Sequence, residues 1–292
     1  MTSLVLKIVL VVSMTIDHIA VVYLPYGSNW YTWLRMFGRP AMPIACFLLV
    51  QGFLKTSSRR KYTVRMLITA VIAEIFWIFL WLRQTMSADA AVKAAYEAAG
   101  GEATWGTADP TEWWKTLDAA TKDGLIGGIV PMLNVLFTFV ICLLMLSVLD
   151  KLQKRFGEML PNQLLKNLGY MFSMVAVIIV TVLVCLILPM DYPLVAPVAT
   201  TACYIFREER KTLMVALAIA GILAGTGGAV YILAWMIALP LIYSYNGSLG
   251  YDKAAKPWVR VLFYAYYPVH LAILVETKYF HEIFDSFSLF GK

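Results

Sequence analysis

An acidic side chain and an imidazole, Asp17 and His18, lie inside the first apolar run of the chain, Leu4 to Leu24. Twenty-one residues at about 1.5 Å each cross a hydrocarbon core of roughly 30 Å, so this pair lies at membrane depth. An ionisable side chain there costs about 3 kcal/mol even on a lenient insertion scale. Because chains keep such residues where they face a polar interior, Asp17 and His18 form the first part of a candidate site. The simpler alternative is a helix-packing pair bonded to backbone.

Four more polar side chains lie in other apolar runs and, with the orientation argued below, at a similar depth. They are Arg39, Glu74, Asn134 and His270. Tyr266 and Tyr267 lie four and three residues before His270, on its side of a helix, and give it the surroundings of a shaped pocket. If they were unpaired, the charges of Asp17, Arg39 and Glu74 would together cost about 9 kcal/mol. This is comparable with the net stability of a whole domain, roughly 5–15 kcal/mol. We therefore expect these side chains to gather around a water-bearing cavity.

Some of these side chains also have simpler interpretations as structural groups. Arg35 is expected to extend its guanidinium to the outer headgroups. Asp17 and His18 are adjacent, so on a regular helix they point about 100° apart, and we expect Asp17 to pair with Arg39. Glu74 can neutralise an arginine.

Two further polar side chains have structural alternatives of their own. Asn134 can form an interhelical hydrogen bond. His270 can be a buried imidazole with all its hydrogen bonds made within the protein.

The composition indicates a helical membrane protein. Of 292 residues, 61% are hydrophobic and only 14% are charged, whereas a soluble domain has about 25% charged residues. All four cysteines lie in apolar runs without metal-type spacing, so we expect no metal site. We predict an all-α polytopic protein with about nine spans (eight to ten) in a single domain, residues 1–292. The predicted spans are 4–24, 32–54, 64–83, 130–149, 168–188, 193–206, 212–226, 229–245 and 260–276.

Basic residues are concentrated in every second connection between these spans. The basic connections are 55–61, 151–166, 207–211 and 253–260. Because positive charge marks the cytoplasmic side, we predict a cytoplasmic N-terminus, an outer C-terminus and contact with bilayer lipids rather than nucleic acid.

The long connection 84–129 is predicted to be an extracytoplasmic insertion. It contains a short helix over 88–99, and we interpret it either as a lid or as a solvated segment without a role.

A turn signature lies on the predicted cytoplasmic side, at Tyr245-Asn246-Gly247, and is followed by Lys253 and Lys256. Backbone amides and basic side chains at a turn can hold phosphate groups. The alternative is that the lysines only reflect the positive charge of cytoplasmic loops.

Several stretches, in this order along the chain, resemble the TraX family, named for F-pilin N-acetylation. They are Ile16–Ile19, Gly38–Ile44, Phe47–Phe53, Arg65 with Glu74, Asn134–Thr138, Tyr245–Gly247 and Phe263–Leu271. The family is distantly similar to the broader membrane acyltransferases that act on cell-surface sugars. The resemblance implies a transferase of the bacterial plasma membrane that uses acyl-CoA, most often acetyl-CoA, as co-substrate. Its acceptor is implied to be a peptide N-terminus, a glycan or a small molecule at the extracytoplasmic face.

On this hypothesis, His18 is the general base that takes a proton from an acceptor amine or hydroxyl. Arg39 or Asn134 stabilises the oxyanion, and His270 is a second base or a proton shuttle. Substrate-binding roles fall to Tyr266, Tyr267, Tyr245, Asn246 and Arg65. Two other classes stay open: a proton-coupled transporter or flippase that relays protons through its acids and histidines, and a non-catalytic membrane assembly factor.

Overall fold

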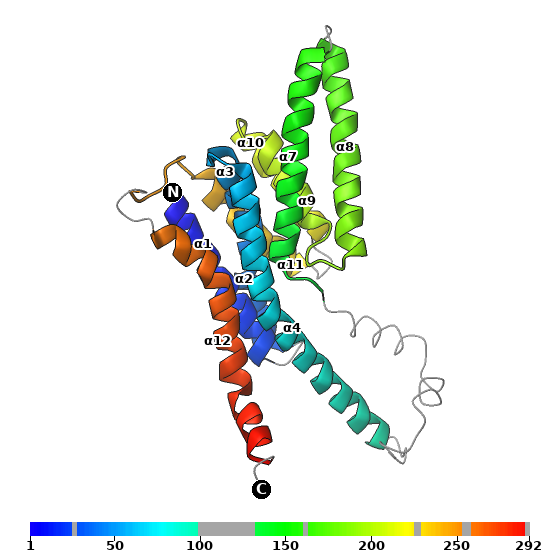
Figure 1. Cartoon of the computed structure of the whole chain (residues 1–292), viewed down its shortest axis with the longest axis vertical. Helices are drawn as coiled ribbons and strands as arrows, with labels where there is room; N and C mark the ends of the chain where they lie inside the picture. Colours follow the sequence, from blue (N-terminus) through cyan, green and yellow to red (C-terminus); the bar gives the residue numbers. More distant parts are fainter. Residues whose placement is uncertain (25–27, 99–131, 160–162, 225–228, 253–257, 290–292) are drawn as a thin grey trace.

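The computed structural model describes residues 1–24, 28–98, 132–159, 163–224, 229–252 and 258–289, and all regular elements in them are helices (Figure 1). In chain order they are α1 (Ser3–Tyr23), α2 (Asn29–Gly38), α3 (Ala41–Lys55), α4 (Arg59–Ala98), α7 (Val135–Met159), α8 (Gln163–Ile187), α9 (Val195–Ile205), α10 (Arg210–Ala224), α11 (Ala229–Tyr243) and α12 (Trp258–Leu289). This confirms the all-α helical membrane fold.

Five helical segments of the described chain are long and apolar enough to cross a membrane. They are Ser3–Tyr23, Asn29–Lys55, Val135–Phe156, Gln163–Ile187 and Trp258–Lys278. Each of the nine predicted spans overlaps one helix or, for 32–54, the pair α2 and α3. α1 and α12 lie side by side and run in the same direction (Figure 1), as an odd number of crossings requires. Nine crossings remain a prediction.

The second predicted span is broken into two helices at Arg39. α2 ends where the Arg39 amide donates to the carbonyls of Arg35 and Met36, and α3 starts after Pro40. Proline has no amide hydrogen to continue a helical ladder, so the break follows from the sequence. It places Arg39 at a junction between two helices.

The stretch 88–98 is helical, as predicted, but it is the end of α4 and not a short helix of its own. α4 runs without interruption from Arg59 to Ala98, over 40 residues. The alanine-rich stretch after residue 87 contains neither glycine nor proline before Gly100, so nothing in the sequence stops the preceding span from continuing. The rest of the predicted insertion, from residue 99, lies outside the described residues.

The helices that enclose the candidate site pack around α1. This helix packs against α2, α3 and α12, and α12 packs in turn against α4. α7 and α8 project beside this group as a hairpin (Figure 1). Much of α8 exposes large apolar side chains, including Phe172, Ile179 and Ile187, as a helix in contact with lipid does.

The start of the chain pairs with the turn after α11. The Ser3 and Leu4 amides donate to the carbonyls of Ser248 and Leu249, at 2.9 and 3.0 Å, and the Asn246 amide donates to the Met1 carbonyl at 2.8 Å. Gly250 has a φ of 81°, and a side chain there would collide with Thr2. These bonds fix the N-terminal end of α1 beside the predicted cytoplasmic turn.

The predicted topology can be tested with reporter fusions. Alkaline phosphatase fused to the C-terminus is expected to be active, because the enzyme needs the oxidising outer compartment, and a fluorescent protein at the same place should be dark. A fluorescent protein fused to a chain that ends after Arg207, in a basic connection, is the matched control and should be bright. A bright C-terminal fusion would contradict the odd number of crossings.

Candidate functional site

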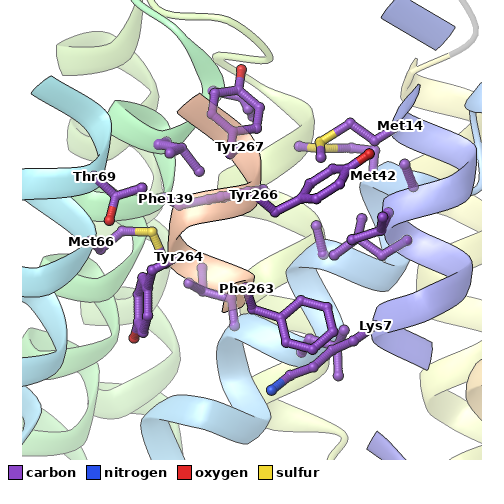
Figure 2. Close-up of a pocket in the computed structure, with 18 of the residues that line it drawn as sticks. Lys7, Met14, Met42, Met66, Thr69, Phe139, Phe263, Tyr264, Tyr266 and Tyr267 are labelled. Carbon is purple, nitrogen blue, oxygen red and sulfur yellow. The ribbon is translucent and has the colours of Figure 1, made fainter. Parts of the chain in front are cut away.

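A cavity of about 780 Å³ lies between α1, α3, α4 and α12. Its lining extends from Lys55 and Arg65, at the predicted cytoplasmic end, to His18 and Arg39 deeper in the bundle. The middle part is mostly apolar, and Figure 2 shows Met14, Met42 and Met66 around it, with aromatic side chains of α12 between them. The volume falls in the range of small-molecule pockets, roughly 300–1,000 Å³.

His18 of α1 and His270 of α12 are joined by a direct hydrogen bond. Nδ1 of His18 lies 2.6 Å from Nε2 of His270, and the two rings are parallel within 5°. Nδ1 of His270 lies 3.0 Å from the carbonyl oxygen of Tyr266, one turn earlier. His18 lines the cavity, while His270 is buried behind it.

The bonding of this pair assigns its tautomers. A carbonyl oxygen only accepts, so Nδ1 of His270 carries a hydrogen, and Nε2 of the neutral ring accepts. The hydrogen between the rings then belongs to Nδ1 of His18, which leaves Nε2 of His18 with a lone pair. Among the described residues, no hydrogen bond engages that Nε2 atom. His18 therefore lines the cavity with a fixed tautomer, in which Nε2 can accept a proton.

Asp17 pairs with Arg35, which corrects two expectations. An ion pair joins the Asp17 carboxylate to the Arg35 guanidinium, and both side chains are largely buried, at 13% and 16% exposure. Arg35 therefore does not extend to the headgroups, and Arg39 is not the direct partner of Asp17. Gly38 lies against Asp17, and a Cβ at this position would collide with the carboxylate group. The bare glycine backbone thus lets α2 approach α1 closely enough for this ion pair.

Arg39 lines the cavity from the junction between α2 and α3. Its Nη1 donates to the hydroxyl of Tyr192 at 2.7 Å, and its guanidinium lies 4.8 Å from the ring centroid of Tyr231. Its Nε is buried without a hydrogen-bond partner among the described residues. The guanidinium is therefore held in one orientation by Tyr192 and Tyr231.

The connection between α8 and α9 supplies the partners of Arg39. Tyr192 has a φ of 53°, a left-handed conformation that is uncommon for any residue except glycine. Backbone bonds between Leu133 and both Pro189 and Asp191 hold the connection in place. Burial raises the pKa of Asp191, which also lines the cavity, to about 7, while the nearby Arg39 guanidinium opposes the shift.

Glu74 and Asn134 bond to each other instead of lining the cavity. The Asn134 side-chain amide donates to Oε2 of Glu74 at 2.6 Å and to the Ala70 carbonyl at 3.0 Å. Its Oδ1 accepts from the Leu136 amide, which makes Asn134 the cap of α7. Both amide hydrogens are in use, so we assign this pair to the packing of α4 on α7 and not to an oxyanion. Glu74 has no arginine partner among the described residues.

The other predicted binding residues divide between the two ends of the cavity. Tyr266 and Tyr267 line it near the histidines, and the Tyr266 hydroxyl bonds to Thr15 on α1. At the predicted cytoplasmic end, Tyr245 lines the wall and accepts a bond from Lys55 Nζ at 2.8 Å. Arg65 lines the same end.

Asn246 is exposed and outside the cavity lining, where its side chain accepts from the Ser248 amide. Its role is therefore to shape the turn. Lys253 and Lys256 lie outside the described residues.

Three cavity residues were not predicted from the sequence. Trp77 lies with its ring centroid 6.3 Å from that of His18, and its indole donates to the Met132 carbonyl. Tyr192 belongs to a connection that looks ordinary in the sequence. Lys7, in α1, is a basic residue within an apolar run. The same pattern identified Asp17 as a candidate site residue.

The structure thus places a hydrogen-bonded imidazole pair and an arginine beside one cavity, and the protein is a helical membrane protein with a buried, polar-ended cavity. In the described residues, no cluster of three His, Cys, Asp or Glu side chains is arranged to hold a metal. The chain belongs to the TraX family, because the family model (TraX protein) matches residues 3–88 and 123–277. The residues between these ranges, 89–122, fall within the predicted insertion.

A curated relative is similar over nearly the whole chain. It is a probable fimbrial assembly protein FimC, serogroup H1, from Dichelobacter nodosus. The two are 27% identical over 277 residues, which cover 94% of this chain and 95% of the relative. No solved structure matches the fold.

The buried ion pair yields a prediction for stability. Asp17→Asn or Arg35→Gln alone leaves an uncompensated buried charge and is expected to lower the free energy of unfolding by about 3–5 kcal/mol. The double variant removes both charges and should recover a large part of that loss, as measured by thermal unfolding in detergent. If the two single losses simply add, the ion pair is not the source of the effect.

The capping pair yields a second prediction. Asn134→Ala removes a helix cap and leaves Glu74 without its donor, so it should destabilise the protein by about 2–4 kcal/mol. The exposed Asn167→Ala, in α8, is the matched control and should change little. Equal melting temperatures for the two variants would contradict the assignment.

Proposed function

We propose that this protein is an acyltransferase of the bacterial plasma membrane that moves an acetyl group from acetyl-CoA to an acceptor at the extracytoplasmic face. The acceptor supplies an amine or a hydroxyl. The observation that carries this proposal is the His18–His270 pair, which presents a free imidazole nitrogen to a cavity with a basic cytoplasmic end.

The proposed reaction uses the two histidines as one unit. Nε2 of His18 takes the proton as the acceptor nitrogen or oxygen attacks the thioester carbonyl carbon. When the tetrahedral intermediate collapses, the C–S bond breaks and the leaving thiolate receives that proton. His270 holds the His18 ring in the required tautomer and stabilises the transient imidazolium through the bond to Nδ1, as the orienting member of a catalytic triad does.

Arg39 is the proposed oxyanion donor. It lines the same cavity as His18, and its guanidinium is oriented by Tyr192. A positively charged donor that is fixed before the reaction can stabilise developing negative charge without reorganisation. Asn134, the other candidate from the sequence, has its amide hydrogens bonded to Glu74 and Ala70.

The cavity suits a donor that enters from the cytoplasm. Arg65 and Arg260 line its cytoplasmic end together with Lys55. These cations would attract the phosphates of CoA, and the apolar middle would accept the pantetheine arm.

An assembly role is compatible with this chemistry. The relative from Dichelobacter nodosus is described as a probable fimbrial assembly protein. Acetylation of a fimbrial or pilin subunit would connect the two descriptions, whereas a purely structural assembly factor would need no oriented base.

The proposal is tested with purified protein in proteoliposomes and radiolabelled acetyl-CoA. We expect thiol release and transfer of label, measured separately for a peptide with a free N-terminus and for a sugar hydroxyl. His18→Gln should lower the rate by about a hundredfold or more, because general-base catalysis contributes roughly 10²–10⁴-fold. His270→Gln should lower kcat and leave the KM for acetyl-CoA nearly unchanged.

Two controls separate this proposal from its alternatives. His281 lies beyond the last predicted span, and His281→Gln should keep full activity. Full turnover by His18→Gln would remove His18 from the mechanism. Proton-coupled uptake without any dependence on CoA would indicate a transporter, and neither activity would indicate an assembly factor.

A further inference from the structure

Lys7 has no part in the reaction described above, yet its side chain lines the cavity. The residue lies in α1 and is half-buried, and its Nζ lies 4.7 Å from the ring centroid of Phe263 on α12. Figure 2 shows the side chain extended beneath Phe263 at the edge of the pocket. A lysine that only reached for headgroups would extend outward to lipid. Instead, this ammonium is held in the cavity wall.

No carboxylate pairs with Lys7 among the described residues. The cation–π contact with Phe263 contributes about 0.5–2 kcal/mol but does not neutralise the charge. An anion bound in the cavity would supply the missing partner.

Lys55, at this end of the cavity, already bonds to the Tyr245 hydroxyl and the Gly247 carbonyl. Two other cations line the same end: Arg65 of α4, 5.9 Å from the ring centroid of Tyr264, and Arg260 in the first turn of α12. The acids that line the cavity, Asp17 and Asp191, lie at the opposite end. Three cations from three helices without an acid among them favour a ligand with several negative charges, such as a diphosphate.

The distance from Lys7 to His18 matches a particular ligand. Eleven residues of one α-helix separate them, which is roughly 16 Å at 1.5 Å per residue. In CoA, the chain from the diphosphate to the sulfur contains about as many bonds as four residues of extended backbone, or roughly 14 Å. The axial separation of the two residues and the length of the arm are therefore comparable.

The wall between these two residues suits such an arm. Leu10, Val11 and Met14 of α1 line it, and Met42 and Ala45 of α3 line it as well. The methyl and methylene groups of pantetheine would replace water against these side chains. A polar linker of the same length would gain less there.

We propose that Lys7 binds the diphosphate of the acyl donor, and that its spacing from His18 along α1 sets the length of arm that brings a thioester to the base. This inference rests on the proposed function. It identifies the donor class as an acyl thioester on a phosphorylated pantetheine arm, held by its charged end.

The test compares two donors, acetyl-CoA and acetyl-pantetheine, which lacks the phosphates. Lys7→Met should raise the KM for acetyl-CoA about tenfold to a hundredfold, the loss expected for one charge-assisted hydrogen bond, and leave the KM for acetyl-pantetheine unchanged. Lys7→Arg should restore most of the affinity. Lys61→Met removes an exposed lysine outside the cavity lining and serves as the matched control.

The length of the arm is tested on the unaltered protein. An acetyl-CoA analogue with one extra β-alanine unit in its arm should compete with acetyl-CoA at nearly the same concentration but donate acetyl much more slowly. Transfer at the normal rate would overturn the spacing argument. An equal rise of KM for both donors in Lys7→Met would overturn the diphosphate contact and reduce Lys7 to a structural residue.

Binding of CoA without turnover separates this inference from the proposed function. Titration calorimetry of CoA into the protein in nanodiscs should show weaker binding to Lys7→Met than to the unaltered chain. If that difference is found but no acetyl transfer occurs with any acceptor, the donor site stands and the transferase proposal fails. If transfer occurs and CoA binds both forms equally, the transferase proposal stands and the role of Lys7 is refuted.

Discussion

The candidate site depends on one interaction, the hydrogen bond between the imidazole rings of His18 and His270. The Tyr266 carbonyl accepts from His270, His270 accepts from His18, and His18 is left with one nitrogen open to the cavity. Without His270, Nδ1 of His18 would lose its hydrogen-bond partner, and without His18, Nε2 of His270 would lose its own. The same bond therefore gives a partner to one buried nitrogen of each ring and fixes the tautomer of His18.

Charge is distributed unevenly along the cavity. At the deep end every charged group has a counterpart: Asp17 has Arg35, and Arg39 has Tyr192 with Asp191 nearby. At the cytoplasmic end the lining cations have no lining acid. A ligand with an anionic end and a nearly neutral reactive end would therefore bind in one orientation. Such a field selects direction as well as affinity, because the reversed ligand would place its phosphates beside carboxylates.

The sequence predicted the class of fold, and it identified several side chains that the structure brings together, because both follow from the cost of placing polar groups in a membrane. Apolar runs predicted the spans, and the cost of buried charge singled out His18, Arg39 and His270 before any geometry was known. The pairing of Asp17 was wrong because it depends on local backbone: the break at Pro40 turns Arg39 away, and Arg35 faces α1 instead.

Other details could not be predicted because they depend on contacts far apart in the chain. The bond from Asn134 to Glu74 could not be predicted, since the two are 60 residues apart. Tyr192 occupies a left-handed conformation that its residue type does not favour, so only the assembled connection explains its place beside Arg39. Lys7 differs from these two residues because the sequence does contain a signal for it, a charged residue inside an apolar run.

The two histidines are 252 residues apart, and this separation has a consequence for biogenesis. Ribosomes add about 5–20 residues per second, so α1 enters the bilayer roughly 10–50 s before α12 emerges. During that interval His18 has no second imidazole to bond to. The protein thus completes its hydrogen-bonded imidazole pair only with the last helix.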